Sequence, residues 1–206
     1  MPLFGFSKSS KGLKRYEELA NLFYTTRDIK KYSANDVDED TVRKLIEAAV
    51  LAHSMGDAQP WEFVIVRDET TKRHIVEACY SQTWMLRAPV LIIACVNNRI
   101  EKGMYAERGE RLYGIQDVAC AIQNLRLAAR AFGLGTAWIG EFAEARVSAA
   151  VHCDQYHRPC AIITVGWPVE KPKAPFRHSV DEVMNYEEIG QSEFHKTVMK
   201  AKTKRV

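Results

Sequence analysis

The chain of 206 residues lacks the cysteine spacing that a disulfide framework or a zinc ribbon requires. Its five cysteines are odd in number and scattered, and no two of them form a C-x-x-C pair. Scattered thiols of this kind are typical of small, buried side chains in a reducing compartment. They are Cys79, Cys95, Cys120, Cys153 and Cys160.

The chain also has little excess charge and no long apolar run. Its 29 basic and 26 acidic residues leave a formal charge of +3, which is too balanced to indicate a nucleic-acid or membrane binder. The longest apolar run, Val90 to Val96, is far shorter than the roughly 20 residues that span a bilayer. Residues 1–16 contain neither a long apolar core nor a small-residue cleavage site, so we expect no signal peptide and a cytoplasmic location.

Familiar catalytic and cofactor motifs are missing as well. No G-x-G-x-x-G or P-loop pattern occurs, so a nicotinamide or a nucleoside triphosphate is not held by the usual glycine loops. The six histidines show neither H-E-x-x-H nor another metal-binding spacing. We therefore expect no metal site and no acyl-transfer site.

The composition that remains is that of a globular protein, with 47% apolar and 27% charged residues. No repeat, low-complexity block or linker occurs before residue 167. At about 150 residues per domain, this predicts a single domain over residues 1–206. Within it, we expect residues 168–206 to form a C-terminal arm with a basic tail.

Apolar periodicity predicts several helices. They cover residues 13–24, a segment beginning after Asp38, residues 71–79 and residues 112–132. Gly133 follows the last of these at the position where glycine commonly ends a helix. The polar, glycine-bearing segment 99–111 is expected to be a flexible lid.

Runs of β-forming residues predict four strands, at 61–66, 89–96, 136–140 and 161–167. A fifth strand is expected at 183–186. Because these strands alternate with helices, the pattern favours a sheet with a layer of helices on each side.

Three clusters of residues could carry function. They are the basic segment 26–32, the polar turn 53–61 and the glycine-flanked segment 133–142. Taken singly, they are typical of a charge run, a loop and a helix end. In this order and spacing, followed by Gly166-Trp167-Pro168 and later basic residues, they resemble the motifs of the nitroreductase family of FMN-dependent oxidoreductases. The resemblance covers roughly residues 20–186.

This resemblance implies an α+β protein with the three-layer α/β/α nitroreductase fold, a central mixed sheet and a C-terminal arm exchanged across a homodimer. It implies FMN at the dimer interface and ping-pong chemistry, in which NAD(P)H reduces FMN and a nitroaromatic, quinone or similar small acceptor is then reduced. Such chemistry needs no catalytic side chain, because the cofactor carries it. We expect a homodimer and a small-molecule acceptor as partners, with no nucleic acid and no membrane.

The resemblance also assigns the residues that bind FMN. Arg27 and Lys30 match basic positions that hold the phosphate, and Arg177 matches a late arginine at the same site; such groups form charge-assisted hydrogen bonds to phosphate. The turn that begins at Ser54 matches one that reaches the flavin from the second subunit, and small residues of segment 137–140 would lie beside the flavin ring. The full expected set is Arg27, Asp28, Ile29, Lys30, Ser54, Met55, Asp57, Gln59, Ala137, Trp138, Ile139, Gly140 and Arg177.

Some positions depart from the family pattern. Thr26 stands where the first arginine of the phosphate segment is expected, and Asp28 stands where a serine is expected. A carboxylate beside a phosphate is unfavourable by about 1 kcal/mol at 4 Å in water. We therefore expect Asp28 to face ribityl hydroxyls, to pair with a base or to serve the substrate. His53 replaces a proline, Asp57 an asparagine and Gly140 a glutamate.

Two alternative functions are also compatible with the sequence. Asp28 and Ser54-Met55-Gly56 resemble the family branch that breaks down reduced FMN to dimethylbenzimidazole, although Trp138-Ile139-Gly140 lacks the serine of that branch. The second alternative is a non-catalytic FMN-binding protein with its basic tail as an interaction arm. That tail contains Lys196, Lys200, Lys202, Lys204 and Arg205.

Overall fold

The structure, a computed structural model, describes residues 11–190, and these divide into two compact units after Pro172. The second unit contains the short helix α7 (Val180–Val183), which begins with a capping box between Ser179 and Glu182. The expected strand at 183–186 is therefore wrong, because the capping box satisfies the first backbone N–H groups of a helix. The basic tail lies outside the described residues.

The first unit is built on a four-stranded sheet in the order β1-β2-β4-β3. The strands are β1 (Trp61–Val66), β2 (Val90–Asn97), β3 (Gly135–Ile139) and β4 (His157–Gly166). All three pairings between them are antiparallel, which corrects the expected mixed sheet. Among the described residues, parallel pairing is confined to an isolated bridge between Asp28 and Thr136.

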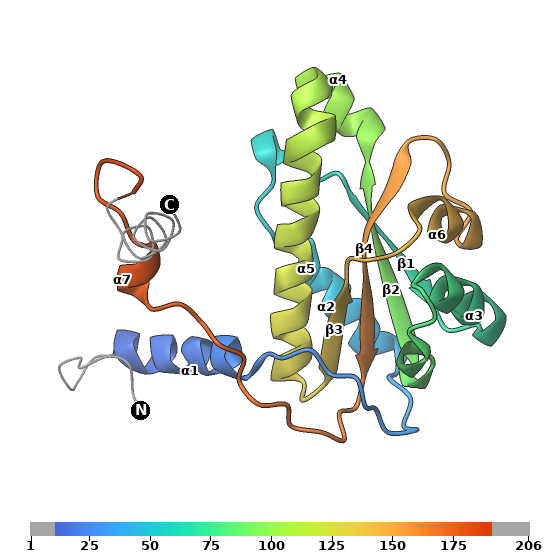
Figure 1. Cartoon of the computed structure of the whole chain (residues 1–206), viewed down its shortest axis with the longest axis horizontal. Helices are drawn as coiled ribbons and strands as arrows, with labels where there is room; N and C mark the ends of the chain where they lie inside the picture. Colours follow the sequence, from blue (N-terminus) through green and yellow to red (C-terminus); the bar gives the residue numbers. More distant parts are fainter. Residues whose placement is uncertain (1–10, 191–206) are drawn as a thin grey trace, which may run out of the picture. The chain divides into compact units, whose positions relative to one another are not determined.

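Helices cover both faces of this sheet, as Figure 1 shows. Successive residues of β2 point to opposite faces. Val90, Ile92, Ala94 and Val96 pack in one apolar cluster with α2 (Glu39–Ala49) and α5 (Gly114–Ala131). The intervening residues pack in a second cluster with α3 (Glu69–Ala78) and α6 (Glu144–Ala150). The expected three-layer α/β/α arrangement is confirmed.

The predicted helices are confirmed with small changes in their bounds. Helix α1 spans Lys11–Thr25, and α2 begins directly after Asp38, whose carboxylate accepts a hydrogen bond from the Thr41 N–H (2.7 Å). Helix α5 ends before Gly133, which has a left-handed φ of 79°. Among the helices within residues 11–190, none has the length and apolar character needed to cross a membrane.

The expected flexible lid at 99–111 is instead helical. Helix α4 (Asn98–Arg108) is capped by the side chain of Asn97, which accepts a hydrogen bond from the Arg99 N–H (3.1 Å). A single π-helical turn, Gly109–Tyr113, joins α4 to α5. Glu101 is fully buried under this junction, so the segment is fixed by packing that its polar composition does not reveal.

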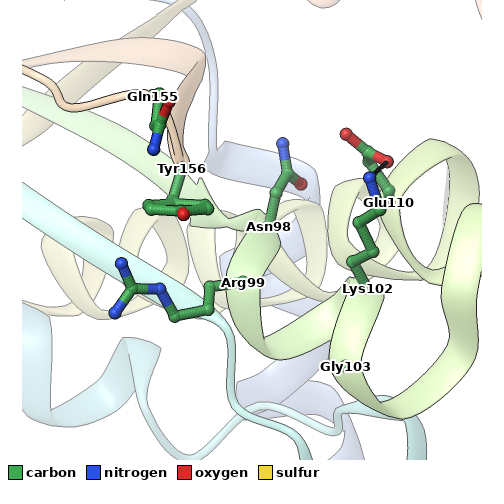
Figure 2. Close-up of a pocket in the computed structure, with 7 residues that line it drawn as sticks. All are labelled: Asn98, Arg99, Lys102, Gly103, Glu110, Gln155 and Tyr156. Carbon is green, nitrogen blue, oxygen red and sulfur yellow. Dashed lines mark ion pairs between the residues drawn. The ribbon is translucent and has the colours of Figure 1, made fainter.

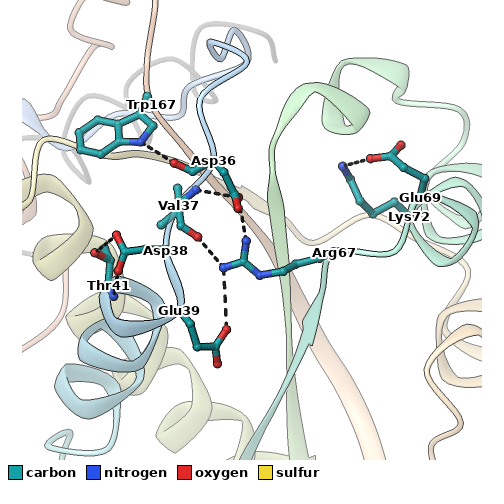
Figure 3. A network of polar contacts seen from close by, with 9 residues as sticks. All are labelled: Asp36, Val37, Asp38, Glu39, Thr41, Arg67, Glu69, Lys72 and Trp167. Atoms are coloured by element: carbon teal, nitrogen blue, oxygen red, sulfur yellow. Dashed lines mark hydrogen bonds and ion pairs between the residues drawn. The ribbon is translucent and has the colours of Figure 1, made fainter.

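A polar network holds the segment that leads into α2 (Figure 3). Arg67, which follows β1, forms an ion pair with Asp36 (2.7 Å) and donates to the Val37 carbonyl. The indole N–H of Trp167, which follows β4, donates to the Asp36 carbonyl (3.0 Å). Residues after two different strands therefore fix the start of α2.

Candidate cofactor-binding site

Segment 26–32 lies along the outer edge of β3. The Ile29 N–H donates to the Thr136 carbonyl (2.9 Å), which closes the isolated bridge described above. Ile29 is buried against Gly135, where an added Cβ would lie 2.7 Å from the Ile29 side chain. The absence of a side chain at Gly135 lets the segment approach β3, and Asp28 and Lys30 remain exposed on either side of Ile29.

A buried chain of hydrogen bonds fixes this segment to the sheet. The Tyr32 hydroxyl donates to the Ile29 carbonyl (2.5 Å), so its contact with the Thr164 hydroxyl (2.6 Å) is one in which Thr164 donates. The Thr164 oxygen accepts in turn from the Ala137 N–H (3.0 Å). Burial raises the pKa of Tyr32 above its usual value, which keeps the hydroxyl protonated and able to donate.

Asp28 pairs with a base, which is one of the three roles expected for it. Its Oδ1 lies 2.6 Å from Nη2 of Arg126 on α5 and accepts a hydrogen bond from the Trp138 N–H (3.3 Å). Arg126 also donates through Nε to the Thr136 hydroxyl (3.3 Å). Sequence reasoning missed Arg126, and no local signal marks it, because the pair joins residues 98 positions apart.

Two cations of the expected set have no carboxylate partner. Arg27 is half-buried and donates to the Thr26 carbonyl (2.7 Å), and the Lys30 ammonium lies 5.4 Å from the centre of the Trp84 ring. Among the described residues, no ion pair joins either cation to an acidic side chain. Because Asp28 is paired with Arg126, Arg27 and Lys30 are cations of segment 26–32 that could each bind an anion such as phosphate.

Glu170 is a second residue that the sequence did not indicate. One of its carboxylate oxygens accepts the backbone N–H groups of Lys30 (2.7 Å) and Lys31 (3.0 Å). It therefore holds the backbone of the basic segment and does not pair with the lysine side chains. Its position shortly after Gly166-Trp167-Pro168 is the only signal that sequence reasoning could have used.

The end of β3 places two small residues, Ala137 and Gly140, on either side of Trp138 and Ile139. Ala137 and Ile139 are buried, Trp138 is half-buried and Gly140 is exposed. A Cβ added at Gly140 would come no closer than 3.6 Å to another described atom, which is an ordinary contact. The packing of the chain itself therefore does not require glycine at this position. Its small size leaves room for a flat ligand to approach the backbone.

The turn Ser54–Gln59 lies near the opposite end of α5. The Met55 N–H donates to the buried carboxylate of Asp117 (3.1 and 3.2 Å). Burial raises the pKa of Asp117, and the hydrogen bond from Met55 partly offsets this effect. Within the turn, the Ser54 hydroxyl accepts the Gln59 N–H (3.1 Å), and Asp57 accepts the Gln59 side-chain amide (2.8 Å).

Helix α4 covers this turn. Gly56 has a left-handed φ of 54°, and an added Cβ there would overlap the hydroxyl of Tyr105 on α4. Glycine suits this position because it adopts a left-handed φ without strain and leaves space for the Tyr105 side chain. The structure thus places Ser54, Met55, Asp57 and Gln59 in a turn held from both α4 and α5.

The expected residues form two separate groups within one chain. Asp117, which binds the turn, and Arg126, which binds Asp28, are nine residues apart on α5, or about 13 Å along the helix axis. Figure 1 shows segment 26–32 and the turn near different ends of this helix. Arg177 belongs to the second unit, so its place at the phosphate site stays a prediction.

A pocket of about 380 Å³ lies beside the start of α4 and contains none of the expected residues (Figure 2). In it, the Arg99 guanidinium stacks 4.1 Å from the centre of the Tyr156 ring, and Lys102 lies 3.9 Å from Glu110. The expected cofactor site therefore does not depend on this pocket. Within residues 11–190, no group of three or more histidine, cysteine or acidic side chains could hold a metal ion.

Comparisons with known proteins agree with the motifs. A "Putative NADH dehydrogenase/NAD(P)H nitroreductase" from Methanothermobacter thermautotrophicus is 32% identical over 72% of this chain and 76% of its own. A "5,6-dimethylbenzimidazole synthase" from Rhodospirillum rubrum is 28% identical over 75% of this chain and 83% of its own. An "FMN reductase [NAD(P)H]" from Bacillus subtilis is 25% identical over 79% of this chain and 70% of its own.

Solved structures show the same fold. The "hypothetical oxidoreductase YcnD" from Bacillus subtilis superposes with a TM-score of 0.80 at 22% identity and covers 91% of this chain and 81% of that chain. The family model described as "Nitroreductase family" matches residues 24–84 and 76–167, which include every expected site residue except Arg177. The chain belongs to the nitroreductase family.

Proposed function

We propose that the protein is an FMN-dependent oxidoreductase that takes hydride from NAD(P)H and reduces a nitroaromatic, a quinone or a similar small acceptor. One observation carries this proposal: Arg27 and Lys30, which form no ion pair among the described residues, belong to the segment that lies along β3, and the exposed Gly140 directly follows this strand. This arrangement suits a ligand with an anionic group and a flat ring. The names of the nitroreductase and FMN reductase relatives support the same cofactor and reductant.

The described residues suit the parts of FMN. Arg27 and Lys30 would hold the phosphate through charge-assisted hydrogen bonds. Arg126 would keep the Asp28 carboxylate neutralised, and the backbone from Trp138 to Gly140 would lie beside the ring. When bound, FMN supplies the transfer of hydride and electrons, so the chain needs to provide position and electrostatics.

We further propose that the protein acts as a homodimer. The turn Ser54–Gln59 is too far along α5 to meet Arg27 of its own chain, so a second copy would bring this turn to the site. Two surfaces are suited to burial between copies. Helix α1 exposes Leu19, Phe23 and Tyr24, each by 46–51%, and an apolar groove of about 620 Å³ runs between α2 and β1.

An exchanged C-terminal arm is part of this proposal. Strand β1 has one strand neighbour among the described residues, and the adjacent groove is lined by its half-buried Phe63, Val64 and Ile65. The second unit exposes apolar side chains that could cover such a surface, with Phe176 at 76% and Tyr186 at 71%. Arg177 of the arm would complete the phosphate site. We include a cytoplasmic location in the proposal, in line with the scattered free thiols.

The visible spectrum of the purified protein tests the cofactor. We expect flavin absorbance bands at one FMN per chain and their loss on anaerobic addition of NADH or NADPH. Steady-state oxidation of NAD(P)H with a nitroaromatic or a quinone then tests turnover. A protein that binds no FMN on reconstitution would contradict the cofactor assignment. A yellow protein that is neither bleached nor active would support the non-catalytic alternative.

A second candidate function is the conversion of reduced FMN to dimethylbenzimidazole. It is favoured by Asp28 and by the similarity to the Rhodospirillum rubrum synthase. Chromatography of the flavin after many turnovers separates the two functions. We expect intact FMN, because Trp138-Ile139-Gly140 lacks the serine of the flavin-destroying branch. Accumulation of dimethylbenzimidazole from reduced FMN and oxygen, lost in Asp28→Ser, would favour the synthase.

A further inference from the structure

Two cysteines far apart in the sequence bring their sulfur atoms together inside the protein. Cys95 on β2 and Cys153, which follows α6, have Sγ atoms 4.0 Å apart, although 58 positions separate them. Both belong to the apolar cluster on the α3 and α6 face of the sheet. Neither has a part in the proposed FMN site.

The two thiols differ in their access to solvent. Cys95 is 1% exposed, whereas Cys153 is only partly buried. A small oxidant in solution can therefore reach Cys153 and would meet Cys95 only through it. Cys153 is therefore placed to react first with the oxidant, and Cys95 is placed to react with the oxidised Cys153.

The remaining cysteines are placed differently. The Cys160 thiol donates to the Arg158 carbonyl (3.5 Å), Cys79 is fully buried and Cys120 is exposed. Among the hydrogen bonds of the described residues, only the Cys95–Cys153 contact joins two sulfur atoms. Cys160 and Cys120 therefore provide controls for the pair within the same chain.

A covalent bond between the two sulfur atoms would require a small movement. A disulfide requires sulfur atoms about 2.05 Å apart, so the two must approach by about 2 Å. Cys153 lies in the irregular connection between α6 and β4, where rotation of the side chain can supply this movement. Cys95 lies at an irregularity in the pairing of β2 with β4, between Ala94 and Cys95.

We propose that Cys95 and Cys153 form a reversible intramolecular disulfide when the protein meets a hydroperoxide. The Cys153 sulfur attacks the peroxide, an S–O bond forms as the O–O bond breaks, and an alcohol or water leaves. The Cys95 sulfur then attacks the resulting sulfenic acid, so that an S–S bond forms, the S–O bond breaks and water leaves. The two thiols lose two electrons and two protons in total, and the hydroperoxide is reduced.

The surroundings of the pair make this reaction slow. Burial raises the pKa of both thiols, and the negative charges of Glu62 and Asp154 act in the same direction. Both thiols are therefore protonated at neutral pH, whereas the thiolate is the nucleophile. The pair stays reduced on brief contact with an oxidant and responds to sustained exposure.

Peptide mapping after treatment with hydrogen peroxide tests the proposal. We expect the intact chain to lose two hydrogen atoms, with a Cys95 peptide linked to a Cys153 peptide and complete reversal by dithiothreitol. A Cys120→Ser background removes the exposed thiol and its links between chains. In that background, Cys160→Ser should keep the link, whereas Cys153→Ser and Cys153→Ala should abolish it and leave Cys95 as a thiol.

Two results would overturn the proposal. One is the absence of a peptide that links Cys95 to Cys153 in wild-type protein that has been treated with peroxide for several times as long as the full oxidation of Cys120 requires. The other is a link from Cys153 to Cys160 in place of Cys95. The test does not depend on FMN, because the mapping is made on protein with or without the cofactor and reads only the state of the thiols.

Discussion

Charged side chains at the proposed site differ in whether they have a partner of opposite charge or a backbone partner. Asp28 and Arg126 neutralise each other at 2.6 Å, and Glu170 is occupied by two backbone N–H groups. Arg27 and Lys30 keep their charges unpaired among the described residues. The capacity to bind an anion therefore depends on which charges have partners, and the net charge of the segment alone does not reveal it.

Replacement of Arg27 by alanine should weaken FMN binding. The loss of one charge-assisted hydrogen bond to the phosphate costs about 1.5–3 kcal/mol, which corresponds to roughly 10- to 150-fold in Kd. Titration of the apoprotein with FMN measures this change. Arg73→Ala, which removes an exposed arginine of α3 outside the site, is the matched control and should bind as the wild type does. Equal titration curves for both variants would place the phosphate elsewhere.

Replacement of Asp28 by serine should have opposite effects on stability and on binding. Without its partner, the Arg126 guanidinium, whose side chain is only 14% exposed, loses its ion pair, and the apoprotein should lose up to about 1 kcal/mol of stability. FMN should bind about fivefold more tightly, because the loss of the carboxylate leaves the positive charge of Arg126 unpaired at the site. Urea unfolding and FMN titration measure the two effects. Arg126→Met, in contrast, should weaken FMN binding, and tighter binding by that variant would refute the assigned pairing.

The junction of α4 with α5 is the element in which sequence reasoning and structure differ most. Ala106 adopts φ 51° and ψ −138° inside α4, and a π-helical turn follows at Gly109–Tyr113. Such irregularities cost free energy and persist only where surrounding contacts fix them. Here Tyr105 covers the turn at Gly56, and Glu101 fills the space beside Gly109 and Gly114.

Glu101 should make the stability of the protein depend on pH. It is fully buried, and neither carboxylate oxygen has a hydrogen-bond partner among the described residues. Burial, with the charge of Asp117, raises the pKa of Glu101 in the folded state. Its contribution to stability is therefore fully present below the pKa of the unfolded chain and is lost as the pH rises through the folded-state pKa.

The variant Glu101→Gln should not show this loss of stability at high pH. We expect its free energy of unfolding to exceed that of the wild type by about 1–3 kcal/mol at about pH 9, with a smaller difference at about pH 5. Urea unfolding across this range measures the effect. The control is Glu107→Gln, which changes an exposed carboxylate of the same helix. A constant difference between Glu101→Gln and the wild type at all pH values would contradict a raised pKa.

Local signals explain which elements could be predicted. The start of α2 after Asp38, the strand at Trp61–Val66 and the end of α5 before Gly133 follow from capping, alternation and a C-terminal glycine. The same reasoning could have found α7, because Ser179 and Glu182 have the spacing of a capping box. Helix α4 has one such signal, the cap at Asn97, but its irregular end is held by contacts that no local pattern shows.

Sequence motifs likewise indicated some segments of the candidate site, whereas the residues that hold these segments in place were missed. The motifs identified the segments that contain Arg27, Met55 and Gly140, because backbone turns and glycines leave local patterns. Arg126 and Asp117 were not identified, because each acts on a residue more than 60 positions away. Long-range pairing of charges has no periodicity that a single sequence can show.

Apolar side chains of the described residues are accessible to solvent in three places. Leu19 and Phe23 on α1 and Phe176 and Tyr186 in the second unit are exposed, and Phe63, Val64 and Ile65 on β1 are half-buried. Single apolar side chains are common on protein surfaces, whereas a group of them on one helix, or beside an open strand edge, favours an interface. A homodimer would bury them and bring the two groups of site residues together.

Dimer formation should make both stability and cofactor binding depend on protein concentration. The unfolding midpoint should rise with concentration, because association stabilises the folded chain by mass action. We expect two FMN per dimer, and the loss of FMN on dilution to parallel the appearance of monomer. Thermal unfolding at several concentrations, together with sedimentation analysis, measures this. A monomer that retains stoichiometric FMN would contradict a site shared between two copies.

The open edge of β1 has a consequence for handling the protein. Dilution normally protects proteins from aggregation, because collisions become rarer. Here dilution would release single chains whose β1 edge presents unpaired backbone groups and apolar side chains to any extended segment that it meets. The fraction of chains with an uncovered edge should therefore rise on dilution, so a dye that binds exposed apolar surface should fluoresce more strongly per chain in dilute samples, even though aggregation itself becomes slower.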